Sequence, residues 1–490
     1  MLREAPAAAE DNAARGPADI VAPMDAAAGT GAEGSAARGW RGEARAQWRL
    51  AAPVVLVQVG LFAMGFVDNV MVGHVETDVA TQMAGTALGS LYTWVVLAFG
   101  MGTLMALDPL VAQAFGAGDL AAVTRDVQRG VVLALLMSLP AALLLQFAEP
   151  VLRALGQQPT AIPVAAAYAR WAVPGVPAFL LFVVLRQTLQ ALHRLRPIVV
   201  TVLVANVANA VLDWGFVRGE LGLPALGGVG CAIATSLCRW LMLVLLLVGA
   251  WPLLAPHLRP MRWREAARGQ PLLALLRLGL PNGAMVDLEI AAFGAVALWM
   301  NYLGDAQLAG HQVALNLAAL AFMVPLGISA AAAVRVGHAI GRGDAHGARL
   351  AGNVAIGTGA LVMTVSAALF ALVPRTLAGI YTDEPDIIAL AAVLLPIAAV
   401  FQVFDGVQIA ANGVLRGTGD TRTPMLVYFI GYWAFGLPLA WWLGLRCGYG
   451  PAGMWWSLVA ALAAVALVLV LRARARLARP LARTSVEGPN

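Results

Sequence analysis

Apolar stretches of about 20 residues recur along the chain and are separated by short polar breaks. A helix rises about 1.5 Å per residue, so about 20 residues cross the hydrocarbon core of a bilayer. The pattern therefore predicts an all-α integral membrane protein with twelve transmembrane helices. We expect these spans at 50–72, 84–110, 130–147, 163–184, 197–217, 229–254, 278–303, 308–334, 353–374, 387–415, 424–445 and 452–471.

The composition excludes a soluble globular protein. Of the 490 residues, 60% are hydrophobic and only 12% are charged, which is about half the charged share of a soluble domain. The basic residues are all arginine, and most lie in the breaks between apolar stretches. This placement favours contact with lipid head groups over nucleic acid. The three cysteines form no CxxC pair, and we expect them to pack as small apolar groups.

The arginines also predict an orientation. Counted alternately, the even-numbered breaks between spans hold fifteen arginines and the odd-numbered breaks hold four. The arginine-rich side of a membrane protein faces the cytoplasm. Both termini fall on that side, as a disordered tail at 1–46 and a basic tail at 473–490. We expect a bacterial inner-membrane protein, and a monomer.

The two halves of the chain resemble each other. Pro53 and Pro281, Asp119 and Asp344, and Pro159 and Pro385 are separated by similar intervals of 225 to 228 residues. Such an offset indicates an internal duplication of six spans. An even number of spans makes the two repeats parallel. We expect an N-terminal lobe at 47–254, a cytoplasmic linker at 255–271 and a C-terminal lobe at 272–472. The lobes form a V and work by alternating access.

Acidic residues within the predicted spans are the first candidates for function. Asp68, Glu289 and Asp405 lie deep in their spans. A charge at the bilayer centre costs about 3 kcal/mol on insertion scales, so such residues are usually functional. A carboxyl group in apolar surroundings can bind and release a proton near neutral pH, and it can also bind Na⁺. For Asp108 and Asp287, structural and functional roles stay open.

Other polar residues within the predicted spans share helix faces with one another. Asn206, Asn209 and Asp213 follow one face of the fifth span, and Gln312 and Asn316 lie four residues apart on the eighth. They either bond helices together or line a cavity. Arg239, in the sixth span, either pairs with an acid or extends to the interface.

Six sequence segments, in order and in both halves, carry a family resemblance. They read GFVDNVMVGH, AQAFGAGD, NVANAVLD with GGVGCAIATS, GHQVALN, RVGHAIGRGD and FDGVQIAANGVLRGTGD. With them the chain resembles the multidrug and toxic compound extrusion (MATE) family, in its bacterial branch. The resemblance implies a secondary antiporter that exports organic cations in exchange for H⁺ or Na⁺, with no other cofactor.

The resemblance also implies roles for individual residues. Asp68 matches the acid linked to proton coupling in the first lobe, and Asn206, Asn209 and Asp213 match the polar network around it. Glu289 and Asp405 match the acids linked to cation binding in the second lobe, where Na⁺ is possible. Phe401 departs from the pattern, which has a tyrosine at this position in its sodium site. The missing hydroxyl shifts the expectation toward protons.

Two other functions were weighed. A flippase for lipid-linked precursors should carry a cationic cavity for pyrophosphate, but only Arg170 and Arg239 favour it among mainly acidic in-span charges. An intramembrane hydrolase would need a catalytic motif, and neither HExxH nor GxSxG occurs. We therefore expect a transporter and no enzyme, with small organic cations and membrane lipids as its partners and without nucleic acid.

Overall fold

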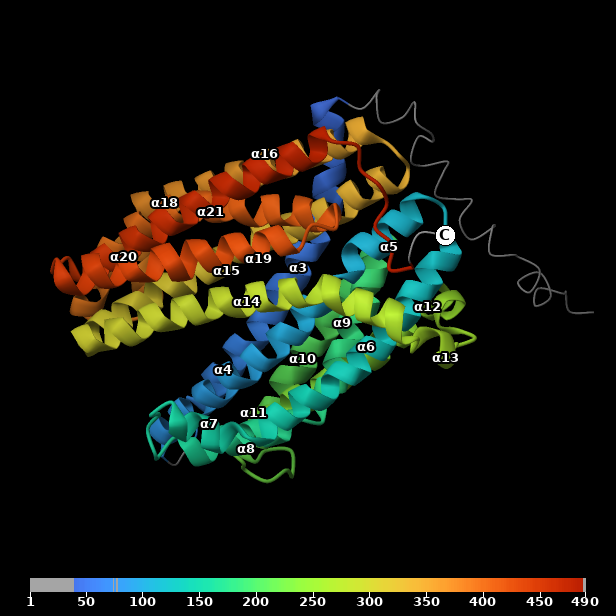
Figure 1. The fold of residues 1–490 in the computed structure, drawn as a ribbon. Coiled ribbons are helices and arrows are strands. Elements are labelled where there is room, and N and C mark those ends of the chain that lie inside the picture. The colour runs from blue at the N-terminus through green and yellow to red at the C-terminus, as the bar shows by residue number, and fades with distance from the viewer. Residues whose placement is uncertain (1–38, 74, 76–77, 488–490) are drawn as a thin grey trace, which may run out of the picture.

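The computed structural model describes residues 39–73, 75 and 78–487, and within this part the chain forms helices and no strand (Figure 1). The first half consists of α3 (Trp40–Val72), α4 (Val79–Leu104), α5 (Leu107–Gly116), α6 (Leu120–Gln146), α7 (Ala148–Ala154), α8 (Ile162–Ala172), α9 (Gly175–Ala191), α10 (Arg196–Arg218), α11 (Gly228–Gly249) and α12 (Trp251–Leu258). We call these helices the N-lobe. The short α13 (Trp263–Ala266) follows them.

The second half, which we call the C-lobe, has the same pattern of long helices. It consists of α14 (Gly269–Leu303), α15 (Asp305–Gly341), α16 (Ala345–Leu372), α17 (Pro374–Gly379), α18 (Pro385–Gly417), α19 (Arg422–Tyr428), the π-helix η1 (Phe429–Gly436), α20 (Leu437–Trp441), the π-helix η2 (Trp442–Arg446) and α21 (Gly450–Ala478).

The number of spans agrees with the sequence. In the described part of the chain, eleven helices or continuous helical stretches are long and apolar enough to cross a membrane, and the bent pair α8–α9 makes a twelfth. Each predicted span corresponds to one of these. The prediction of an all-α protein with twelve spans is confirmed when α8 and α9 are counted together.

Three predicted boundaries need correction. The span expected at 163–184 is broken, because α8 and α9 meet at an angle of 54° around Val173 and Pro174. Proline has no backbone N–H to continue a helix, which accounts for a break at this point. The tail expected at 1–46 ends earlier, since α3 already begins at Trp40, and residues 1–38 lie outside the described part. The tail expected from 473 begins later, since α21 continues to Ala478.

The duplication is visible in how the third span of each half begins. Asp119 accepts a hydrogen bond from the backbone N–H of Ala122 (2.9 Å), and Asp344 accepts one from Gly347 (2.7 Å). Each aspartate therefore caps a helix N-terminus, α6 in the N-lobe and α16 in the C-lobe. The glycine before each has a φ of +73°, a left-handed conformation that glycine adopts without steric cost.

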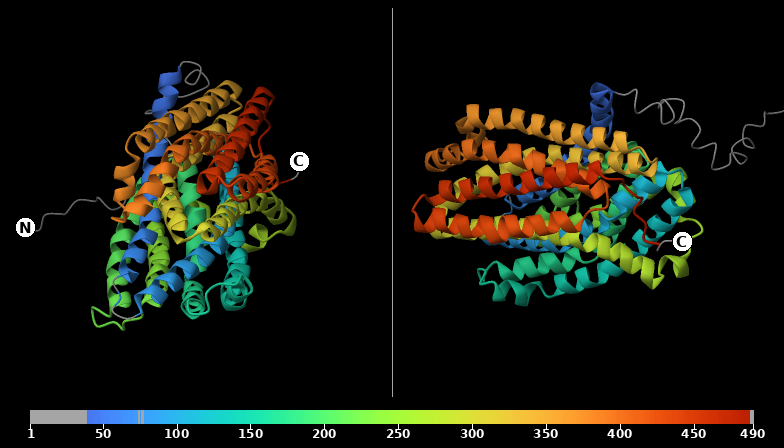
Figure 2. Two further views of the ribbon diagram at one scale, coloured as in Figure 1. Left: turned by 90° about the vertical axis from the view of Figure 1, so that its left-hand side faces the viewer. Right: turned by 45° about the horizontal axis from the view of Figure 1, so that its top comes forward.

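The two lobes meet at one end of the molecule and diverge toward the other (Figures 1 and 2). Arg335 on α15 pairs with Glu43 on α3 (Nη2–Oε2, 2.6 Å), and Gln47 on α3 donates to the Ile328 carbonyl (3.0 Å). These contacts join the start of α3 to the second half of α15. We call this end of the molecule the closed end.

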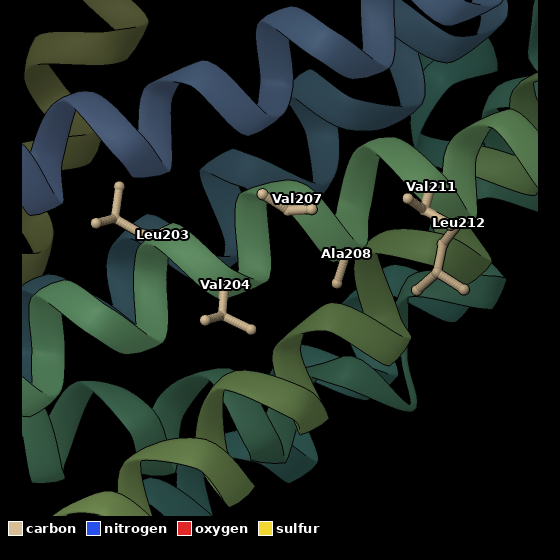
Figure 3. A pocket seen from close by; sticks show the side chains of 6 residues that line it. All are labelled: Leu203, Val204, Val207, Ala208, Val211 and Leu212. Carbon is tan, nitrogen blue, oxygen red and sulfur yellow. The ribbon is translucent and has the colours of Figure 1, made fainter.

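Helix α10 carries apolar side chains on its outer face and polar side chains on its buried face. Its outer face carries apolar side chains that line a shallow hollow, namely Leu203, Val204, Val207, Ala208, Val211 and Leu212 (Figure 3). Four of them are exposed, as expected for contact with lipid chains. Asn209 and Asp213 on the same helix are buried, with 1% and 0% of their surface exposed. The carboxylate of Asp213 therefore faces the interior of the N-lobe.

Candidate functional site

A cluster of acids lies inside the N-lobe between α3, α10 and α11. Asp68 on α3 accepts a hydrogen bond from the Thr235 hydroxyl (Oγ1–Oδ2, 3.2 Å). Asn209 and Asp213 on α10 lie close enough to interact with the same carboxyl group. Asp68 is only 8% exposed, so the group is enclosed by protein. Three of the residues predicted from sequence, Asp68, Asn209 and Asp213, are thus neighbours.

Most carboxylate oxygens of the N-lobe cluster have no hydrogen-bond donor among the described residues. Among the described residues, the Asp68 Oδ1 atom and both carboxylate oxygens of Asp213 are buried without a hydrogen-bond partner. Asp68, Asp213 and Cys231 each bring a ligand atom to within 4.8 Å of the other two. Two carboxylates this close repel each other when both are charged. A proton or a cation held between them would relieve that repulsion.

Arg239 lies one helical turn beyond Thr235 on α11. Its guanidinium group sits over the Phe179 ring, 5.4 Å from the ring centroid, and its Nη1 atom is buried without a hydrogen-bond partner in the described part of the chain. The aliphatic Cδ also packs near the position that a Cβ on Gly175 would occupy. Arg239 forms no ion pair with an acid among the described residues, and its charge acts on Asp68 from a distance, so neither role expected for Arg239 is confirmed.

A second cluster surrounds Glu289 on α14 in the C-lobe. Its Oε1 atom accepts hydrogen bonds from Gln408 Nε2 and from the Tyr432 hydroxyl, both at 3.3 Å. Tyr432 also lies 3.3 Å from Gln408 Oε1, and Gln408 Nε2 donates to the Tyr428 hydroxyl at 2.8 Å. The side-chain amide of Gln408 therefore connects both tyrosines to the Glu289 carboxylate and restricts the orientation of that carboxylate.

The π-helix η1 brings the two tyrosines to this position. Tyr428 ends α19 and Tyr432 lies in η1, and their ring centroids are 5.6 Å apart. Gly431 lets this span approach α21, because a Cβ there would lie 2.2 Å from Val465 Cγ2. π-helical turns are rare and often occur at functional sites.

Asp405 lies near Glu289 but is surrounded differently. It is 6% exposed and interacts electrostatically with Glu289. Phe401, one turn earlier on α18, packs edge-on against Phe293 and Trp455, with centroid distances of 6.0 and 5.9 Å. Phe401, which occupies the position of the expected tyrosine, thus contributes an aromatic ring and no oxygen.

Several predicted residues lie apart from these clusters. Asn206 is half-buried, donates to the Val202 carbonyl on its own helix (2.8 Å) and faces Gly60 of α3. Gln312 and Asn316 are exposed on α15, without a hydrogen bond to any described residue. Asp287 is half-buried on α14. Asp108 belongs to the closed end, where its Oδ2 atom pairs with Arg416 Nε of α18 at 3.0 Å.

Sequence reasoning missed five members of the clusters, namely Thr235, Cys231, Gln408, Tyr428 and Tyr432. Cys231 and Thr235 share a face of α11, since they are four residues apart. Gln408 follows Asp405 by three residues and so shares its face of α18, a signal that could have been used. Tyr428 and Tyr432 are also four residues apart, but the π-helix η1 that begins between them is not predicted by the apolar pattern.

Comparison with known proteins agrees with this architecture. The sequence model of the MatE family matches residues 53–214 and 283–442, one stretch in each lobe. The multidrug resistance protein NorM of Aliivibrio fischeri is 37% identical over 432 residues, which cover 86% of this chain and 93% of that protein. NorM of Photobacterium profundum is 36% identical over 442 residues, which cover 89% and 96%.

A solved structure shares the fold at lower sequence identity. The eukaryotic MATE transporter AtDTX14 superposes with a TM-score of 0.79 at 22% identity, covering 91% of this chain and all of that one. The relatives give no support to the flippase alternative. The family match in both lobes and the identity to NorM proteins over most of the chain confirm the resemblance drawn from the sequence, and the chain belongs to the MatE family of multidrug and toxic compound extrusion transporters.

Proposed function

We propose that this chain exports organic cations from the bacterial cytoplasm in exchange for protons, with one buried acid cluster in each lobe. The observation that carries the proposal is the pair Asp68 and Asp213, because three of their four carboxylate oxygens have no hydrogen-bond donor among the described residues. A negative site with so few internal donors favours an external positive charge. Protons and cationic substrates can supply that charge in turn, so each weakens the binding of the other.

The C-lobe cluster supports protons over Na⁺ as the coupling ion. Sodium requires oxygen ligands with free lone pairs. Glu289 already accepts two hydrogen bonds through Oε1, and Phe401 supplies no oxygen beside Asp405. A carboxyl group needs only one free oxygen to take up a proton. We therefore assign Glu289 and Asp405 to proton exchange, and Na⁺ at this pair becomes the less favoured alternative.

The orientation follows from the arginines at the closed end. There Arg335 pairs with Glu43 and Arg416 pairs with Asp108, each across the two lobes. The breaks richest in arginine lie at the same end. By the positive-inside rule this end faces the cytoplasm, which leaves both termini cytoplasmic in the inner membrane. The arrangement is then an outward-facing state, and alternating access requires the closed end to separate. We propose that a monomer carries out this cycle.

The test is transport by the purified chain in proteoliposomes. An imposed pH gradient should drive a fluorescent organic cation across the membrane, and a sodium gradient alone should not. Transport under the sodium gradient alone would assign the coupling ion to Na⁺. Absence of transport under both gradients would contradict exchange of ions for organic cations.

A further inference from the structure

The chain does not end where the C-lobe ends. After α21, residues 479–487 leave the C-lobe and run across the closed end to the N-lobe, seen as the red segment that reaches the cyan helices in Figure 1. We call residues 479–487 the C-terminal strap. None of the acid clusters described above includes any of its residues.

The strap is fixed to the C-lobe at its start. Arg349 of α16 donates from Nε to the Leu477 carbonyl (2.8 Å) and from Nη2 to the Ala478 carbonyl (3.1 Å). These bonds satisfy carbonyls that the end of α21 leaves without helical partners. Leu481 then packs against the C-lobe core. The strap therefore begins at a defined point on the C-lobe.

The rest of the strap binds the N-lobe. Arg483 Nη1 pairs with Asp119 Oδ2 at 3.0 Å, and Val486 is buried in the N-lobe core. Glu487 Oε1 pairs with Arg129 Nη2 at 2.6 Å and with Arg125 Nε at 2.9 Å. Arg129 is 5% exposed, so its pair with Glu487 is the best shielded of the three.

One side chain connects the strap to the seam between the lobes. Gln113 of α5, in the N-lobe, donates from Nε2 to the Gly417 carbonyl of the C-lobe (2.9 Å). Its Oε1 atom accepts a hydrogen bond from the backbone N–H of Thr484 in the strap (2.6 Å). Any movement that separates α5 from α18 disturbs both bonds of this amide.

We propose that the C-terminal strap holds the lobes together at the closed end and slows the change to the state that is open there. Separation of the lobes stretches the path from Ala478 to Glu487. Nine extended residues reach only about 30 Å, so the anchors at Asp119, Arg125 and Arg129 release when the separation exceeds that reach. The strap thus adds to the interlobe pairs Glu43–Arg335 and Asp108–Arg416, and its effect does not depend on the identity of the cargo.

The test measures the distance between the lobes in the full-length chain. Spin labels at Ala121→Cys on α6 and His346→Cys on α16 report the closed end, since both residues are exposed and belong to different lobes. Cys447→Ser removes the exposed native thiol, and Cys231 and Cys238 are buried. The strap variants are Arg483→Gln, Glu487→Gln and Asp119→Ser. Serine keeps an oxygen to cap α6 while the ion pair is lost.

Each strap variant should raise the ratio of long to short distances by about two- to fivefold, the range expected for one partly exposed ion pair. Asp119→Ser combined with Arg483→Gln should do no more than either alone, because both remove the same pair. The matched control is Arg474→Gln, which removes one exposed arginine of α21 without an ion pair among the described residues. Unchanged distances in the strap variants, or an equal change in the control, would overturn the proposal. Size-exclusion elution checks that each variant is folded.

Discussion

Asp68 and Asp213 are brought together by residues far apart in the sequence. Asp68 comes from α3 and Asp213 from α10, and neither carboxylate meets a basic side chain within hydrogen-bond distance in the described part of the chain. The sequence alone shows that both acids lie within predicted membrane spans. Their spacing could not be predicted from the sequence, because it depends on how α3 packs beside α10.

Asp68→Asn should abolish exchange and leave membrane insertion intact. Asparagine keeps the shape of the side chain and still accepts from Thr235, but it has no charge and no titratable proton. The measurement is transport of a fluorescent organic cation in proteoliposomes under a pH gradient, beside size-exclusion elution of the purified variant. Native rates in a folded variant would refute the role of Asp68.

Tyr432→Phe should slow transport about tenfold. The change removes one hydrogen bond to the Glu289 carboxylate, and hydrogen bonds to charged groups contribute about 1.5 kcal/mol or more. Phe293 and Tyr428 still pack around the ring, so the fold should persist. Tyr449→Phe is the matched control, because Tyr449 is 67% exposed. Equal rates for Tyr432→Phe and the native chain would show that the hydroxyl does not position Glu289.

The apolar pattern of the sequence predicts where helices form. It does not predict where a helix bends or widens into a π-helix. The spans predicted from twenty-residue apolar runs match the helices, since lipid requires that length. The bend between α8 and α9 lies at Pro174, and Gly431 packs η1 closely against α21, and the apolar pattern predicts neither irregularity. The tyrosines that position Glu289 were missed for this reason.

Glycines allow α14 and α4 to cross closely between the lobes. A Cβ on Gly279 would lie 2.0 Å from the Thr103 carbonyl oxygen, and one on Gly283 would lie 2.6 Å from the Phe99 carbonyl oxygen. Gly279 and Gly283 are four residues apart, a spacing that lets helix backbones approach in membranes. The crossing joins helices of different lobes.

Gly283→Val should therefore force the lobes apart without unfolding either one. The expected result is a longer distance between the labels at Ala121→Cys and His346→Cys and a lower transport rate. Gly294→Val on the same helix is the matched control, because no atom lies within 4 Å of a Cβ there. A native distance in Gly283→Val would mean that the crossing is not needed for closure.

The sequence predicted two lobes and a linker between them, but not the side-chain contacts that hold the lobes together. The ion pair of Asp108 with Arg416 and that of Asp119 with Arg483 link residues more than 300 positions apart. The basic tail predicted at 473–490 was expected on the cytoplasmic side, without a contact to either lobe. The strap within it could not be inferred, because no local pattern identifies Asp119, Arg125 and Arg129 as its partners.

The strap should release in acid. The hydrogen bond from Ala122 and the nearby Arg483 lower the pKa of Asp119 below 3.8, and the hydrogen bond from Arg129 lowers the pKa of Glu487 below 4.5. A carboxyl group with a lowered pKa stabilises the bound state above its free pKa and loses that effect as the pH falls through the lowered value. Arg125, Arg129, Arg483 and Asp126 are the other charged groups that face the two carboxyls.

At every pH the distance between the spin labels should be at least as long in Arg483→Gln as in the native chain. The difference between the two distances should be constant above pH 4.5. Below that value the difference should shrink, because protonation of Asp119 removes from the native chain the ion pair that Arg483→Gln already lacks. Comparison with the variant removes the effect of pH on the acid clusters. A difference that shrinks already between pH 8 and 6 would contradict the assignment to Asp119.

We propose that buried carboxylates exchange an incoming ion for an outgoing organic cation. The most direct measurement is accumulation of a fluorescent organic cation in proteoliposomes with an acidic interior, with and without a protonophore. We predict accumulation by the native chain that the protonophore collapses, and none by Asp68→Asn. Accumulation that survives the protonophore, or that Asp68→Asn retains, would contradict the account.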